Sequence, residues 1–300
     1  MKKPTYHAIS FTGRRDNNQD ACTVIELGNS TYFFAVADGM GGVAGGQVAS
    51  NHILDNAKSI LQKINFDDIS PEKLKETLSA VFGTSQQALR NKVKERPDLS
   101  GMGTTLSAVL VQDDKIVWGN IGDSRVYLLR QGDLLQLTTD HTYIEDYRKT
   151  KGDDIPQSII DQYSHYLTRA IDGGADDAEL FPDKADYDTL KPGDIILVCS
   201  DGLITNKVNT NTDLMQNLIL GTSTLKQAAK QLISYAFHSD SKDNISVVLA
   251  EFGTCERKNI KINKHFYPPV AYIMNKIFDY KYYLIVGAIL ILAIILLLLI

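Results

Sequence analysis

The stretch Phe33-Phe34-Ala35-Val36-Ala37-Asp38-Gly39-Met40-Gly41-Gly42 ends a continuous apolar run with an acid and then with glycines. An uninterrupted apolar run of this length is typical of a strand that is buried on both faces. Strand ends hold side chains rigidly, so Asp38 is expected in a fixed position. The glycines beside it permit a close backbone approach and leave room for water.

Four other short clusters also place an acid at the edge of an apolar run. They are Arg15-Asp16-Asn17-Asn18-Gln19-Asp20, Gly122-Asp123-Ser124-Arg125, Ser200-Asp201-Gly202 and Asp243-Asn244. Each one alone also fits an ordinary turn or a solvated surface charge. Several carboxylates converging at strand ends would repel one another unless cations lay between them. Oxygen ligands without paired His or Cys favour Mg²⁺ or Mn²⁺ over zinc.

The pattern around these clusters predicts an α+β fold. The expected strands are short runs rich in Val, Ile, Leu and aromatic residues: 31–38, 105–112, 116–121, 125–130, 194–200 and 245–252. Asp113-Asp114 and Gln131-Gly132 are expected to be hairpin turns. Apolar stripes at helical spacing predict one helix through 49–64, a second opening at Ser70-Pro71-Glu72, and a third over 224–237. Hairpin-linked strands with paired helices favour α+β over a regular βαβ repeat.

Composition excludes several classes of protein. The 300 residues are 44% hydrophobic and 22% charged, which is unlike a disordered chain or a collagen. Residues 255–300 carry six Lys or Arg and two acids, a net charge of +4, so the whole-chain charge of −5 leaves −9 on residues 1–254. Such an acidic body argues against nucleic-acid binding. Three scattered cysteines indicate free thiols and no zinc site.

The C-terminal part of the sequence predicts a membrane anchor. Residues 283–300 contain no charge and are nearly all apolar, and a helix of that length would span about 27 Å. The basic residues all precede this run, so the positive-inside rule places the body in the cytoplasm. We therefore divide the chain into a body (1–254), a basic juxtamembrane linker that contains Pro268-Pro269 (255–282) and a transmembrane helix (283–300).

Taken in order, the acidic clusters resemble the motifs of the type 2C family of metal-dependent Ser/Thr protein phosphatases. The resemblance runs from about Arg15 to Phe252, and the methionine after Asp38-Gly39 resembles the bacterial branch. It also includes Gly103-Thr104-Thr105, Leu137-Thr138-Thr139-Asp140-His141, Leu167-Thr168-Arg169-Ala170 and Asp243-Asn244-Ile245-Ser246-Val247. The resemblance implies a central β-sandwich of two antiparallel sheets flanked by helix pairs, with a metal centre at one edge.

The same resemblance implies a role for individual residues. It implies that Asp38 bridges two Mg²⁺ or Mn²⁺ ions and that Gly39 contributes its carbonyl oxygen. Asp201 and Asp243 would complete the shell, and Asp123 would help to hold a possible third ion. Arg15 would bind the substrate phosphate, a task suited to a forked guanidinium. Arg15, Asp38, Asp201 and Asp243 are thus the expected catalytic set, acting through a metal-activated water.

Two positions depart from the family pattern. Gln19 stands where a glutamate is usual, so Gln19 and Asp20 are expected as metal ligands or as residues that support the ligands. Met40 stands where the eukaryotic branch has a proposed general acid, which leaves the proton donor unassigned, and His141 is an alternative candidate. Residues 142–166 match the family's variable flap, and their charges suit a mobile surface loop.

The expected function is dephosphorylation of phosphoserine and phosphothreonine proteins, opposing Ser/Thr kinases at the membrane. The expected partners are phosphorylated proteins, including a kinase or its substrates. A metal- or phosphopeptide-binding module with weakened catalysis is an alternative, supported by Gln19. An unrelated Mg²⁺-dependent phosphohydrolase of small molecules is another, which would need a preformed small pocket and no flap.

Overall fold

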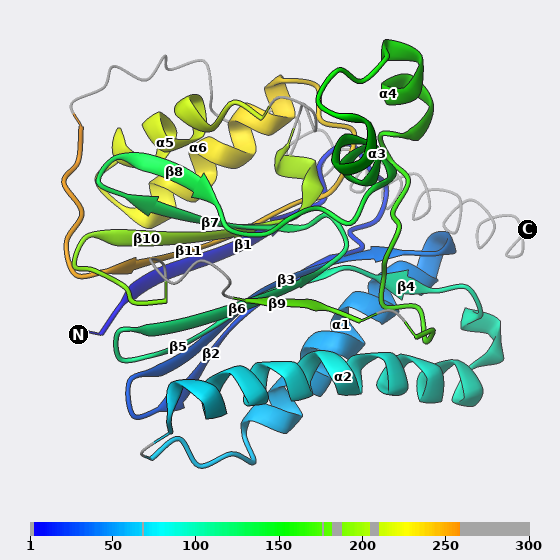
Figure 1. Ribbon diagram of the computed structural model, residues 1–300, viewed down its shortest axis with the longest axis horizontal. Coiled ribbons are helices and arrows are strands. Elements are labelled where there is room, and N and C mark those ends of the chain that lie inside the picture. The colour runs from blue at the N-terminus through cyan, green and yellow to red at the C-terminus, as the bar shows by residue number, and fades with distance from the viewer. Residues whose placement is uncertain (1–2, 68, 176, 182–187, 205–209, 259–300) are drawn as a thin grey trace, which may run out of the picture. The chain divides into compact units, whose positions relative to one another are not determined.

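The computed structural model describes residues 3–258 apart from 68, 176, 182–187 and 205–209. Within that part of the chain, two antiparallel sheets stack face to face (Figure 1). The first sheet has the order β1 (Thr5–Phe11), β11 (Ile245–Phe252), β10 (Asp194–Cys199), β7 (Arg125–Arg130), β8 (Asp133–Gln136). The second has the order β2 (Asp20–Gly28), β3 (Thr31–Met40), β5 (Leu106–Gln112), β6 (Lys115–Ile121), β9 (Glu179–Phe181), and β4 (Gly103–Thr104) pairs with the end of β3.

Two helix pairs cover the outer faces of this sandwich. Helices α1 (Gly42–Leu61) and α2 (Pro71–Glu95) lie against the second sheet, and α5 (Thr212–Leu220) and α6 (Leu225–His238) lie against the first (Figure 1). Short 3₁₀ helices follow α2 at Pro97–Leu99 and β10 at Asp201–Leu203. The α+β class and the two antiparallel sheets expected from the sequence are confirmed.

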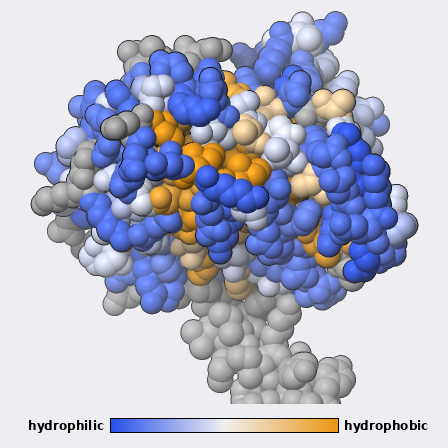
Figure 2. All heavy atoms as spheres, turned by 90° about the horizontal axis from the view of Figure 1, so that it is seen from below, coloured by the Kyte–Doolittle hydropathy of each residue, from blue (hydrophilic) through white to orange (hydrophobic). Residues whose placement is uncertain are grey.

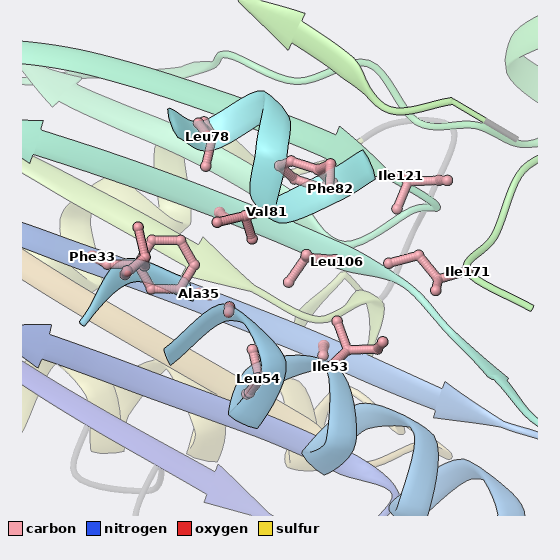
Figure 3. Close-up of a cluster of buried hydrophobic side chains, with 14 of the residues drawn as sticks. Phe33, Ala35, Ile53, Leu54, Leu78, Val81, Phe82, Leu106, Ile121 and Ile171 are labelled. Atoms are coloured by element: carbon pink, nitrogen blue, oxygen red, sulfur yellow. The ribbon is translucent and has the colours of Figure 1, made fainter. Parts of the chain in front are cut away.

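Strand β3 is buried on both faces because the core has two layers that meet on it. Phe34 and Val36 point into the space between the sheets, in a cluster with Trp118 and Val198. Alternate residues point to the helices, and Figure 3 shows Phe33 and Ala35 of β3 in one cluster with Leu54 of α1 and Val81 of α2. Burying each phenylalanine contributes roughly 1.5–3 kcal/mol. The continuous apolar run before Asp38 thus anchors the strand from two sides.

Some apolar side chains of the helix layer are partly exposed at the surface. Figure 2 views the molecule from the side of α1 and α2, and hydrophobic atoms appear there among hydrophilic ones. Partly buried residues such as Ile60 and Ile64 pack at the margin of the helix cluster. The second sheet is therefore covered mainly by amphipathic helices whose outer faces are polar.

Local signals in the sequence are confirmed at several places. The Ser70 side chain caps α2 by accepting a hydrogen bond from the Lys73 N–H, and Pro71 is the first helical residue. Asp113 and Gln131 both have positive φ in the hairpins where turns were predicted. Strands β1, β2, β8 and β9 and helix α5 were not anticipated.

The charged segment after residue 142 differs from the expected loop. It forms two short helices, α3 (Tyr143–Lys151) and α4 (Gln157–Tyr163), which stand apart from the sandwich (Figure 1). The Thr142 side chain caps α3 by accepting a hydrogen bond from the Glu145 N–H. Ile144 is the one buried residue of α3. A helix with so little apolar surface has no stripe for a periodicity argument to detect.

The last described residues contact the body. The Cys255 N–H donates to the Glu251 carboxylate, and the Lys258 N–H donates to the Leu220 carbonyl. In the described residues no helix is long and apolar enough to cross a membrane. The predicted span 283–300, and the linker beyond residue 258, lie outside the described residues.

Candidate metal centre

The predicted acidic residues come from both sheets. Asp20 begins β2 and lies directly opposite Asp38 on β3 in the antiparallel register. Asp123 lies between β6 and β7, where the chain passes from one sheet to the other. Asp201 follows β10 and Asp243 precedes β11, its antiparallel neighbour. Like charges that face each other across strands are destabilising, so this arrangement needs a compensating interaction.

Asp38 is held through its backbone by the Thr104-Thr105 pair. The Asp38 N–H donates to the Thr105 hydroxyl at 3.0 Å, and the Asp38 carbonyl accepts from the Thr104 hydroxyl at 2.9 Å and from the Thr105 N–H at 2.8 Å. These bonds leave the Asp38 carboxylate as the group that faces the site. The sequence marked this Gly-Thr-Thr motif without assigning it a role, because the contact joins positions about 66 residues apart.

Glycine at position 39 is required by a close approach of α1. A Cβ at Gly39 would lie 2.0 Å from the Gly46 carbonyl oxygen, which no side chain permits. The Gly39 N–H also donates to the Gln19 carbonyl at 3.1 Å. The start of α1 and the segment before β2 therefore pack directly on the backbone next to Asp38, as the glycine pattern indicated.

Asp20 joins the two sheets at this edge. The Ser200 hydroxyl donates to Asp20 Oδ2 at 2.7 Å, and the same hydroxyl accepts from the Ser246 N–H at 2.9 Å. Asp20 Oδ1 is buried and has no hydrogen-bond partner among the described residues. Burial, together with the charges of Asp201 and Asp243, raises the pKa of Asp20 to about 7.

The carboxylates converge electrostatically on Asp38. Burial raises the pKa of Asp38 well above its ordinary value, and the charges of Asp20, Asp201, Asp123 and Asp243 raise it further, in that order. All four other acids therefore lie close enough to disfavour ionisation of Asp38. A proton or a cation at this edge would relieve the repulsion.

Arg15 reaches the site from the N-terminal loop. Its guanidinium donates to Asp243 Oδ2 at 2.8 Å and to the Lys242 carbonyl at 2.9 Å, and both side chains of the ion pair keep partial solvent exposure. The predicted phosphate-binding arginine is thus placed beside a predicted metal ligand. An exposed pair of this kind contributes little to stability, so Arg15 can exchange partners at small cost.

Asn244 was quoted with Asp243 in the sequence but given no role, and the structure shows that it holds the N-terminal loop. Its side chain donates to the carbonyls of Thr12 and Asn17 and accepts from the Gln19 N–H at 2.8 Å. It is buried, which makes each of these bonds costly to lose. Its position after Asp243 was the available signal, but its partners lie more than 220 residues earlier in the chain.

Gln19 is held by its own hydrogen bonds. Its side-chain Nε2 donates to the Gly42 carbonyl at 2.6 Å, and its backbone carbonyl accepts from the Ser50 hydroxyl at 2.6 Å. This geometry places the Gln19 amide as a link between the start of β2 and the start of α1. Gln19 and Asp20 were both expected to be metal ligands or supporting residues. Of the two, Asp20 has a buried oxygen without a hydrogen-bond partner among the described residues.

The donor set fits a divalent cation. Among the described residues no three His, Cys, Asp or Glu side chains already surround one point at ligand distance. Asp243 is instead paired with Arg15, and Asp20 with Ser200. However, the acids supply hard oxygen atoms only, they raise the pKa of Asp38 jointly, and Asp20 leaves one buried oxygen without a partner. These properties suit Mg²⁺ or Mn²⁺.

Replacing Asp38 with asparagine is expected to stabilise the metal-free protein above neutral pH. A raised carboxyl pKa means that the folded state binds more protons, so this residue's contribution to stability falls as pH rises from about 4. In chelator at pH 8 we expect Asp38→Asn to unfold about 2–4 °C higher, which is roughly 1 kcal/mol for a chain of this size. At pH 4 the two proteins should melt together.

Asp55→Asn on the exposed face of α1 is the matched control and should shift the melting temperature little at either pH. A lower melting temperature for Asp38→Asn at pH 8 would contradict mutual repulsion as the dominant interaction at this edge.

Comparisons with known proteins agree with this geometry. Residues 12–235 match the model of the protein phosphatase 2C family. The chain is 33% identical over 241 residues to the serine/threonine protein phosphatase PstP of Mycobacterium tuberculosis, covering 79% of this chain and 42% of that protein. It is 31% identical to the serine/threonine phosphatase stp of Listeria monocytogenes, covering 82% and 95% respectively. The chain therefore spans about two fifths of the length of PstP.

The fold has close solved relatives. The crystal structure of the catalytic domain of PstP in complex with two manganese ions superposes with a TM-score of 0.67 at 30% identity, covering 83% of this chain and 97% of that one. The family match covers the second sheet and the acidic clusters from Asp16 to Asp201, and it ends before Asp243 and β11. The chain belongs to the protein phosphatase 2C family.

Proposed function

We propose that this protein is a metal-dependent phosphatase of phosphoserine and phosphothreonine proteins. The observation that carries the proposal is the convergence of four other carboxylates on Asp38, with Arg15 at the margin of the same edge. Membership of the protein phosphatase 2C family, and the manganese in the PstP structure, support the same chemistry. Phosphorylated Ser/Thr proteins are the proposed substrates, and a kinase that works at the same membrane is a proposed partner.

We propose for the metal ligands the roles that the family resemblance implies. Asp38, the Gly39 carbonyl, Asp201 and Asp243 would hold two Mg²⁺ or Mn²⁺ ions, and Asp123 would help to hold a third. Bound ions of this kind lower the pKa of water and offset negative charge on a phosphoryl group. The bond to Ser200 would hold the Asp20 carboxylate in place, and its other oxygen, which has no partner among the described residues, would be available to the ions. The Thr104-Thr105 bonds would keep the Asp38 carboxylate aimed at the site.

Arg15 would bind the substrate phosphate. A phosphate dianion competes with the single carboxylate of Asp243 for the guanidinium, and a forked arginine can make two charge-assisted bonds to it. Release of Asp243 from Arg15 would at the same time free a carboxylate oxygen for a cation. Substrate binding and completion of the ligand set would therefore favour each other.

Activity should depend on divalent metal and on Asp201. With a phosphothreonine peptide and Mn²⁺ we expect turnover that excess chelator removes, and we expect Asp201→Asn to lose at least about a hundredfold in kcat because a direct ligand is replaced. Asp55→Asn is the control and should retain wild-type turnover. Full turnover in chelator would contradict the metal mechanism. Metal binding without turnover would favour the alternative of a regulatory binding module.

Gln19→Glu tests whether the missing carboxylate weakens metal binding. A glutamate would add a full negative charge near the ions, whereas the amide offers a dipole. We expect the Mn²⁺ concentration for half-maximal activity to fall about tenfold, or about 1–2 kcal/mol. The Gly42 carbonyl would lose its donor, so the melting temperature should also fall slightly. Overlapping Mn²⁺ titrations would remove the one sequence argument for a weakened enzyme.

We further propose that residues 283–300 anchor the body (1–254) to a membrane through the basic linker 255–282, with the body in the cytoplasm. Truncation after residue 258, which keeps the Lys258–Leu220 hydrogen bond, should give a soluble and active protein. The full chain should instead sediment with membranes, and protease outside intact cells should leave the body uncut. Digestion of the body by that protease would reverse the proposed orientation.

A further inference from the structure

The flap is joined to the body at His141. Helices α3 and α4 form the flap, and its two ends meet in an isolated bridge between Thr142 and Leu167. The Thr168 N–H donates to the His141 carbonyl at 2.9 Å, so the chain that leaves the flap is bonded to the residue just before it. His141 is therefore bonded directly to the base of the flap.

His141 also holds the residue before Asp123 on both of its backbone polar groups. The Gly122 N–H donates to His141 Nδ1 at 3.2 Å, and the Gly122 carbonyl accepts from the His141 N–H at 2.9 Å. Gly122 has φ +102°, and a Cβ there would lie 2.5 Å from the Thr105 methyl group, so glycine is required. Gly122 thus packs between His141 and Thr105, and the Thr105 hydroxyl accepts the hydrogen bond from the Asp38 N–H.

A second anchor lies on the other side of Asp123. The Arg125 guanidinium donates to both oxygens of Asp140 at 2.6–3.0 Å, and both side chains are buried. Asp140 therefore binds Arg125, and the next residue, His141, binds Gly122. Gly122 and Arg125 flank Asp123 and Ser124. The Asp123 loop is fixed at both ends by the dipeptide that immediately precedes the flap.

The hydrogen-bond pattern defines the state of the His141 ring. A backbone N–H can only donate, so Nδ1 must carry the lone pair and Nε2 the proton. Nε2 lies 3.3 Å from the Glu179 carboxylate of β9. Burial lowers the pKa of His141, which favours this neutral ring. With both nitrogens engaged and the side chain 4% exposed, the ring is not available to protonate a leaving group.

We propose that His141 is a positioning residue that fixes the Asp123 loop to the base of the flap through the Nδ1–Gly122 hydrogen bond, and thereby sets the affinity for the divalent cation that Asp123 would hold. This inference rests on the proposed function for the identity of that cation. It reassigns His141 from a candidate proton donor to a structural link between flap and metal centre.

Two substitutions separate the two ring nitrogens. His141→Asn places an amide oxygen where Nδ1 stands, so the variant can still accept from Gly122. His141→Gln places its amide where Nε2 stands, so it keeps a donor toward Glu179 but has no acceptor at the δ position. Neither amide titrates, so both would disable a general acid equally.

Mn²⁺ binding to the full chain, measured by calorimetry and by the electron paramagnetic resonance of free Mn²⁺, is the primary readout. We expect His141→Asn to bind Mn²⁺ within about threefold of wild type, and His141→Gln to lose about tenfold or more at the weakest site. On a phosphothreonine peptide, His141→Gln should lower kcat and leave KM within about twofold. Glu179→Ala, which removes only the Nε2 partner, should resemble wild type in both measurements.

An equal loss of kcat in His141→Asn and His141→Gln would overturn the proposal and favour an acid role. Wild-type Mn²⁺ binding by His141→Gln would do the same. If His141→Gln does not fold, the proposal stands or falls on His141→Asn and Glu179→Ala, both of which must keep wild-type Mn²⁺ binding. Absence of phosphatase activity in the wild type would refute the proposed function alone, because the Mn²⁺ comparison does not require turnover.

Discussion

The repulsion between Asp20 and Asp38, placed opposite each other on adjacent strands, is the constraint on which the rest of the edge depends. A loose strand end would let the two carboxylates move apart into water, so the fold must hold β3 firmly. It does so by burying β3 on both faces, with Phe34 toward the first sheet and Phe33 toward the helices. Hydrophobic burial thus supplies the free energy that keeps like charges together.

The two sheets must also stay in register at this edge. The Ser200 hydroxyl connects them, because it donates to Asp20 of one sheet and accepts from the Ser246 N–H of the other. Asn244 performs a similar function for the N-terminal loop, which carries Arg15. Small polar side chains next to the acids therefore determine where the acids lie. The acids supply the charge of the site, and the neighbouring polar side chains fix their positions.

Sequence reasoning found the features that local rules control. The run 33–37 indicated a buried strand, Ser70-Pro71 indicated a helix start, and the acids marked the ends of strands. It missed β1, whose residues are all partly or fully exposed and show no apolar run, and the flap helices, which bury almost nothing. It quoted Ser200, Asn244 and Thr105 in the motifs but assigned them no role, because each acts through a contact across more than 60 residues.

The pairing of Arg15 with Asp243 gives the site a defined state before cation and phosphate arrive. In that state the arginine neutralises one of the acids that converge on Asp38, so part of the repulsion is already relieved. A cation can take the place of Arg15 beside Asp243, and a phosphate can take the place of Asp243 beside Arg15. A divalent cation and a phosphate dianion together add no net charge to the site, and the ion pair that they replace is partly exposed to solvent. Hydrophobic burial therefore holds the acids in place, and the ion pair offsets part of their charge until the proposed reactants replace its partners.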